Sequence, residues 1–288
     1  LSAGKCVVFS AIVGGFGTDF GGGGGVISKT EEKSDWRRKE TVLFGIAILL
    51  ILLAVWNLRM NPGSDWWSIY NGAVEWATYH EFKTEWFRVY FNQYQNNIPW
   101  LLMTASLYRV LMMFHITRFY EMSIVLNAVL LVAAIVLLYK MAIVFLKKRT
   151  AMTFLFFCTF YMPFYLNVPV FYTDIPALFF LSLGLHFLSR EKERKDWRWL
   201  LGTGASLGLG FKIKGTVIVV LIAVTIWKIL KGQWKEMAVV LAGAAVCMAC
   251  VGFLVQRSGV VQEEYEESRR LPYTHWIMMG LKDTGTYN

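Results

Sequence analysis

Long apolar runs, each bounded by short clusters of basic residues, constrain the fold of this chain more than any other feature. Of its residues, 56% are hydrophobic and 17% are charged, so one soluble core cannot bury all the apolar surface. Lipid must therefore solvate much of the chain. The sequence predicts an all-α fold, a polytopic bundle of about seven transmembrane helices.

The net charge of +9 is gathered at the ends of apolar runs. The clusters occupy residues 37–39, 147–149 and 190–198. A nucleic-acid footprint would form a stripe along one face instead, so no nucleic-acid partner is expected. Because basic loops remain cytoplasmic, this pattern places loop 59–99, Asp174, Lys212 and Lys214 on the extracytoplasmic side.

Seven runs are predicted to cross the membrane. They are residues 42–58, 122–146, 151–166, 175–188, 199–211, 216–230 and 238–255. An eighth run, 99–114, cannot also cross without moving the basic cluster at 147–149 to the outside. It is predicted to be a helix that lies at the outer interface or re-enters the membrane.

Three segments follow from this pattern. Residues 1–40 are predicted to be a flexible leader with a cytoplasmic basic segment, and a cleaved signal is the alternative. Residues 41–255 form the transmembrane module. Residues 256–288 read as the start of an external loop or domain, expected to be truncated. Cys247 and Cys250 lie in an apolar run without a second ligand pair, which favours packing residues over metal or redox ligands.

The external loop 59–99 is rich in Trp and Tyr, residue types that prefer the headgroup zone of a membrane. A short interfacial helix is predicted to open at Ser64 and Asp65. Its shared face carries Trp67, Tyr70, Val74 and Ala77 at helical spacing. The simplest interpretation of Asp65 is that it complements the helix dipole while Ser64 caps the helix.

Four segments, taken in their order along the chain, resemble motifs of a known enzyme family. They are 64–73 (SDWWSIYNGA), 91–98 (FNQYQNNI), 171–179 (FYTDIPALF) and 208–215 (GLGFKIKG). Together they resemble polyprenyl-phosphate-sugar-dependent glycosyltransferases of the C-type fold, the class that includes protein O-mannosyltransferases and lipid A aminoarabinose transferases. The second segment departs from the pattern of bacterial members, because Gln95 stands where Pro is usual.

The resemblance implies a membrane glycosyltransferase of the cell envelope, with its active site on the extracytoplasmic side of the cell membrane. Its donor would be a polyprenyl-phosphate-linked sugar, and its acceptor a glycan, a lipid or a protein. The reaction needs a base near the acceptor and positive charge near the phosphate. The resemblance assigns the first role to Asp65 and implies that Asp174 joins it at the site. No cofactor is predicted with certainty, and a divalent metal is left open.

The remaining candidates serve the donor phosphate or the substrates. Lys214, Lys212 and Arg109 are candidates for phosphate binding, with Arg118 as a weaker one. Tyr94, Asn96, Asn97 and His275 are candidates for substrate binding. Each has a structural alternative: basic side chains at helix ends extend to lipid headgroups, polar loop residues form turns, and Asp174 begins a helix capped by Thr173.

Two other functions stay open at this point. A polytopic transporter or lipid flippase would use the same charges to line a path. A structural membrane subunit without activity is the third possibility. An enzyme is favoured if Asp65, Asp174 and Lys214 surround one outward-facing cavity.

Overall fold

The computed structural model describes residues 26–261. The predicted leader up to residue 25, His275 and most of the C-terminal segment lie outside the described residues. Contacts divide the chain into two units, Leu1–Val42 and Leu43–Asn288.

Every regular element in the described part of the chain is a helix, which confirms the all-α prediction. The elements are α2 (Val26–Asn57), α3 (Ser64–Tyr79), α4 (Glu85–Gln93), η1 (Gln95–Asn97), α5 (Ile98–Met113), α6 (Phe119–Phe145), α7 (Lys148–Phe160), α8 (Met162–Leu166), α9 (Asp174–Arg194), α10 (Trp197–Ile213), η2 (Gly215–Val217), α11 (Ile218–Leu230) and α12 (Trp234–Arg257).

Three helical segments are long and apolar enough to cross a membrane. They are residues 35–57 of α2, all of α6 and all of α12. The other predicted spans are shorter or more polar helices, for example α11 with 13 residues. The count of about seven spans therefore remains a prediction for the helices beyond these three.

One predicted span is interrupted. The run 151–166 is two helices, α7 and α8, with extended backbone at Tyr161 between them. Pro163 explains the break, because its ring removes the N–H that would bond the carbonyl of Thr159. The hydroxyl of Tyr165 donates to that carbonyl instead. Since Thr159 is buried, its carbonyl needs another donor, and the chain breaks where a side chain supplies one.

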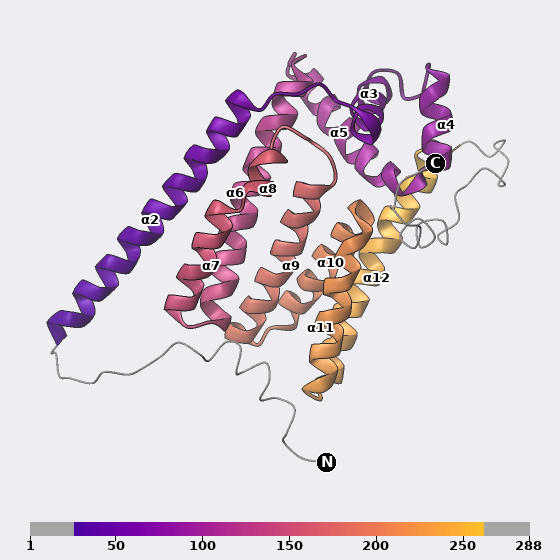
Figure 1. Ribbon diagram of the computed structural model, residues 1–288. Coiled ribbons are helices and arrows are strands. Elements are labelled where there is room, and N and C mark those ends of the chain that lie inside the picture. Colours follow the sequence, from indigo (N-terminus) through magenta and orange to yellow (C-terminus); the bar gives the residue numbers. More distant parts are fainter. Residues whose placement is uncertain (1–25, 262–288) are drawn as a thin grey trace, which may run out of the picture. The chain divides into compact units, whose positions relative to one another are not determined.

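Helices α6, α9, α10 and α12 lie side by side (Figure 1). The closest approach joins α10 to α12 through glycines. A Cβ added at Gly204 would lie 2.0 Å from the carbonyl oxygen of Val240, and one at Gly243 would lie 2.5 Å from that of Leu201. Gly208 meets Ala244 four residues further along both helices, so the two helices run parallel. Small residues at this spacing let membrane helices pack backbone to backbone.

Helices α3 and α5 pack on each other at one end of this bundle, with α4 beside α3 (Figure 1). Helix α5 has 16 residues, fewer than the roughly 20 that a crossing needs. Its length agrees with the predicted non-spanning helix. Pro99 lies in its first turn, where a missing N–H costs nothing.

The helix predicted to open at Ser64 and Asp65 is α3. Of the residues expected to share one face, Ala77 is buried and Trp67 is exposed, while Trp66, Ile69 and Ala73 complete the face that packs inside the protein. This buried face is offset by one residue from the face that the spacing indicated. An apolar periodicity fits two adjacent settings when nearly every position is aromatic or small, and the contact with α5 selects one of them.

We predict that Gly204→Ala lowers the free energy of unfolding by about 1–3 kcal/mol, because the added methyl group must push α10 away from α12. Gly252→Ala is the matched control, since a Cβ there meets nothing within 4 Å. Unfolding in mixed detergent micelles, followed by circular dichroism, measures both. Equal stability of the two variants would contradict the backbone contact.

Candidate functional site

The site begins at the N-terminal end of α3. Gly63 is the N-cap and Ser64 is the first residue of α3, so the predicted capping role of Ser64 is wrong. Ser64 has a φ of 51°, a left-handed conformation that costs a non-glycine residue about 1–2 kcal/mol. Asp65 follows in the first turn, as expected. The strained residue thus directly precedes the predicted base.

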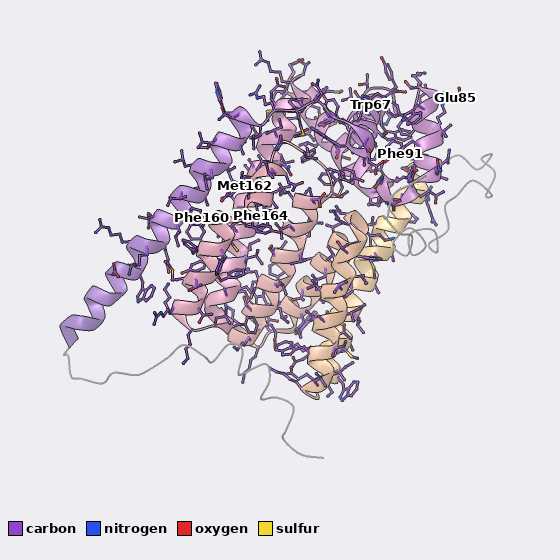
Figure 2. The ribbon with its side chains drawn as sticks, viewed as in Figure 1. Trp67, Glu85, Phe91, Phe160, Met162 and Phe164 are labelled. Carbon is purple, nitrogen blue, oxygen red and sulfur yellow. The ribbon has the colours of Figure 1, made fainter. Side chains whose placement is uncertain are left out.

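Asp65 lines a cavity of about 370 Å³ between the start of α3 and α4. Figure 2 labels Trp67 on α3 and Glu85 at the start of α4. Phe91 of α4 packs where a side chain on Gly72 of α3 would otherwise stand, which brings the two helices together. The lining residues are Ser64, Asp65, Trp67, Ser68, Trp86, Val89, Tyr90, Gln93 and Tyr94.

A hydrogen-bonded network lies beside the carboxylate of Asp65. The side-chain amide of Asn97 donates to the hydroxyl of Tyr90 at 2.8 Å, and its oxygen accepts from Tyr172 at 3.3 Å and from Asn96 at 3.1 Å. Because Tyr90 accepts from Asn97, its own proton is available to the carboxylate of Asp65.

Burial raises the pKa of both Tyr90 and Tyr172, and the negative charge of Asp65 raises each further. Both phenols therefore stay protonated at neutral pH and act as hydrogen-bond donors. The two hydroxyls that neighbour Asp65 come from α4 and from the loop before α9. This loop is 107 positions further along the chain than Asp65 (172 − 65).

Asp174 and Lys214 form an ion pair at the same end of the bundle. Asp174 is the first residue of α9, and Lys214 directly follows α10. Their side chains are 46% and 35% exposed, so a ligand can reach the pair. Neither residue lines the cavity at Asp65, so the three residues that were expected around one cavity do not surround it together. The negative charge of Asp174 also raises the pKa of Tyr172, so this hydroxyl has both carboxylates as neighbours.

Asn127 holds the loop that carries Tyr172, a role that the sequence analysis missed. Its amide nitrogen lies within hydrogen-bonding distance of the carbonyl oxygens of Asn167, Val168 and Val170, at 3.0, 2.9 and 3.0 Å. Its side chain is fully buried in α6. An Asn inside a long apolar run was the available signal, because polar groups at membrane depth need partners.

Arg109 does not join this site. Its guanidinium donates to the carbonyl of Ala77 at 3.2 Å, in the last turn of α3. Asp65 is in the first turn of the same helix, about 18 Å away along its axis. Arg109 thus links α5 to α3 away from Asp65, and its phosphate-binding role stays a prediction.

The other predicted residues are placed as follows. Tyr94 lines the cavity, and Asn96 and Asn97 form the η1 turn. Lys212 lies half-buried in the last turn of α10, and exposed Arg118 precedes α6. Thr173 is the N-cap of α9 without a capping side-chain bond. Within residues 26–261, no group of three His, Cys, Asp or Glu side chains is arranged to hold a metal ion.

Comparisons with known proteins bear on the class of the chain. Neither the search of curated proteins nor the search of solved structures gave a match. A family model described as conserved hypothetical integral membrane protein matches residues 32–288, which is 257 of the 288 residues (288 − 32 + 1). The match agrees with the apolar helices α6 and α12. The chain belongs to this family of integral membrane proteins.

Proposed function

We propose that this protein is a membrane glycosyltransferase, which moves a sugar from a polyprenyl-phosphate donor to an acceptor at the extracytoplasmic face. One observation carries the proposal. A carboxylate in a cavity, Asp65, and the Asp174 carboxylate of an accessible ion pair with Lys214 are neighbours of the same half-buried residue, Tyr172. A base and a cation are the two groups that this reaction requires.

Each of these groups has a separate role in the reaction. The acceptor hydroxyl loses its proton to the carboxylate of Asp65 while its oxygen bonds to the anomeric carbon of the sugar. The bond from that carbon to the phosphate oxygen breaks, and its electron pair leaves with the polyprenyl phosphate. The ammonium of Lys214 stabilises this growing negative charge. Asp174 is a positioning residue that holds Lys214 toward the phosphate.

Sidedness rests on the distribution of basic residues. Many cations lie at the end of the bundle opposite the Asp174–Lys214 pair, around the start of α7 and the C-terminal ends of α9 and α11. They are Lys147, Lys148, Arg149, Lys192, Arg194, Lys195, Lys228 and Lys231. Basic helix ends remain on the cytoplasmic side. The end that holds Asp65 is therefore assigned to the extracytoplasmic side, where a lipid-linked sugar donor is anchored by its polyprenyl chain.

The base is tested by Asp65→Asn in the full chain. We expect the rate of transfer from labelled polyprenyl-phosphate sugars in membranes to fall by about 10² to 10⁴, because the amide cannot take a proton. Glu85→Gln is the matched control, since Glu85 lies in the first turn of the next helix and outside the cavity lining. An Asn variant that keeps more than about a tenth of the activity excludes Asp65 as the base.

The phosphate cation is tested by Lys214→Gln, for which we expect a loss of about 10² or more in rate. Lys214→Arg should restore part of it, since the charge remains while its shape changes. Asp174→Asn removes the ion pair but keeps the cation. We expect it to lose less activity than Lys214→Gln, and the difference separates the effect of the charge from the effect of the pairing. If Lys214→Gln is fully active and Lys212→Gln is not, the phosphate binds at Lys212.

Sidedness is tested with single cysteines in a background that lacks Cys6, Cys158, Cys247 and Cys250. An impermeant maleimide applied to intact cells should label Thr78→Cys, which is exposed in the last turn of α3, the helix that carries Asp65. It should not label Glu193→Cys near the end of α9. The reverse labelling pattern would place the cavity in the cytoplasm and exclude an extracytoplasmic reaction.

A further inference from the structure

The walls of the cavity at Asp65 combine four aromatic side chains with a single carboxylate. The aromatic residues are Trp67, Trp86, Tyr90 and Tyr94. The remaining lining residues are Ser64, Ser68, Val89 and Gln93, all of them uncharged. Among the nine lining residues, all in the described part of the chain, Asp65 has the only carboxylate, and none is Lys, Arg or His. The cavity is therefore negative.

Neighbouring cations in this region are engaged elsewhere. The Nε of Arg88 donates to the carbonyl of Phe82 at 2.8 Å, and Lys83 pairs with Glu81. Lys214 pairs with Asp174 rather than with Asp65. The carboxylate of Asp65 has hydroxyl neighbours, which leave its negative charge in place. A cation supplied by a ligand would neutralise that charge.

The aromatic rings are fixed in ways that leave ring surface accessible. The indole N–H of Trp86 points to the hydroxyl of Ser68 at 3.4 Å, while 57% of the residue remains exposed. Trp67 packs against Phe87 with 5.5 Å between ring centres and is 40% exposed. Tyr90 and Tyr94 pack with ring centres 4.8 Å apart. The faces of aromatic rings attract cations, and Trp does so most strongly.

We propose that this cavity binds an organic ammonium group, with Asp65 as its counter-ion and Trp67 and Trp86 as its aromatic walls. The volume of about 370 Å³ suits a small head group and lies at the lower end of the range for small-molecule sites. An anion is excluded by the charge of Asp65. A neutral sugar could donate hydrogen bonds to the carboxylate but would not compensate its negative charge, so the ammonium is favoured over it.

This site deepens the proposed function, because an ammonium-bearing molecule becomes the acceptor if glycosyl transfer holds. One carboxylate oxygen of Asp65 then binds the ammonium while the other takes the proton of a hydroxyl on the same molecule. Binding itself involves no chemical step, so it is measured without sugar transfer. The ammonium belongs either to a free amine or to a lipid head group.

The test is equilibrium binding of labelled choline to the full chain in phosphatidylglycerol nanodiscs. The competitor is the neutral isostere of choline, in which carbon replaces nitrogen. We expect choline to bind at least about tenfold more tightly than the isostere, since charge supplies both the ion pair and the attraction to the rings. Equal affinity for the two would overturn the proposal.

Variants locate the binding. Asp65→Asn and Trp86→Leu should each weaken choline binding by about tenfold, the first by removing the charge and the second by removing a wall. Trp197→Leu is the matched control, because Trp197 is 58% exposed at the start of α10, outside the cavity lining. Choline binding that survives both cavity substitutions would place the site elsewhere and contradict the proposal.

Two further measurements identify the source of the ammonium and distinguish a failure of the ammonium site from a failure of the proposed function. If phosphatidylcholine nanodiscs abolish the binding of free choline, the lipid head group occupies the cavity; unchanged binding assigns the site to a free amine. Charge-selective binding without any sugar transfer contradicts the glycosyltransferase alone. Sugar transfer without charge-selective binding contradicts the ammonium site alone.

Discussion

A buried backbone carbonyl has no water to bond, and side chains meet this need where the helices of this chain break. Tyr165 donates to the carbonyl of Thr159 that Pro163 leaves open, and Asn127 donates to the carbonyls of the loop that follows α8. That loop carries Tyr172 and leads into Asp174. The geometry of the candidate site therefore depends on satisfying backbone groups several residues away from it.

The ion pairs at the two ends of the bundle differ in how deeply they are buried. Lys228 is 1% exposed and pairs with Glu191 of α9 and Glu236 of α12, which ties three helices together at one end. Buried ions need such partners, since removal of one leaves an uncompensated charge. Asp174 and Lys214 at the other end are partly exposed and remain accessible to a ligand. Only the second pair has the exposure that a phosphate site requires.

The packing of the helices decides which residues lie next to each other in the site. Helices α3 and α4 supply the cavity with Asp65, and the loop before α9 supplies Tyr172. The close contact of α10 with α12 at Gly204 fixes α10, which Lys214 directly follows. A shift of α10 by a fraction of a turn would move Lys214 away from Asp174. The small residues of α10 thus contribute to the site although they do not line it.

The sequence by itself determined which segments are helical and where charges lie along them. Apolar runs and basic clusters predicted helices close to their observed bounds, such as 122–146 for α6, because local hydropathy and proline positions act within one segment. Asp65 in the first turn of α3, and the η1 turn at Asn97, could also be expected from local residue preferences.

Tertiary structure alone decided which side chains meet. It rotated the buried face of α3 by one residue, drew Arg109 to the carbonyl of Ala77, and set Tyr90 and Tyr172 beside Asp65. It also paired Asp174 with Lys214 across 40 positions of sequence. A helix of aromatic and small residues has several nearly equivalent apolar faces, so its rotation is fixed by the shape of the neighbouring helix, which no single segment encodes.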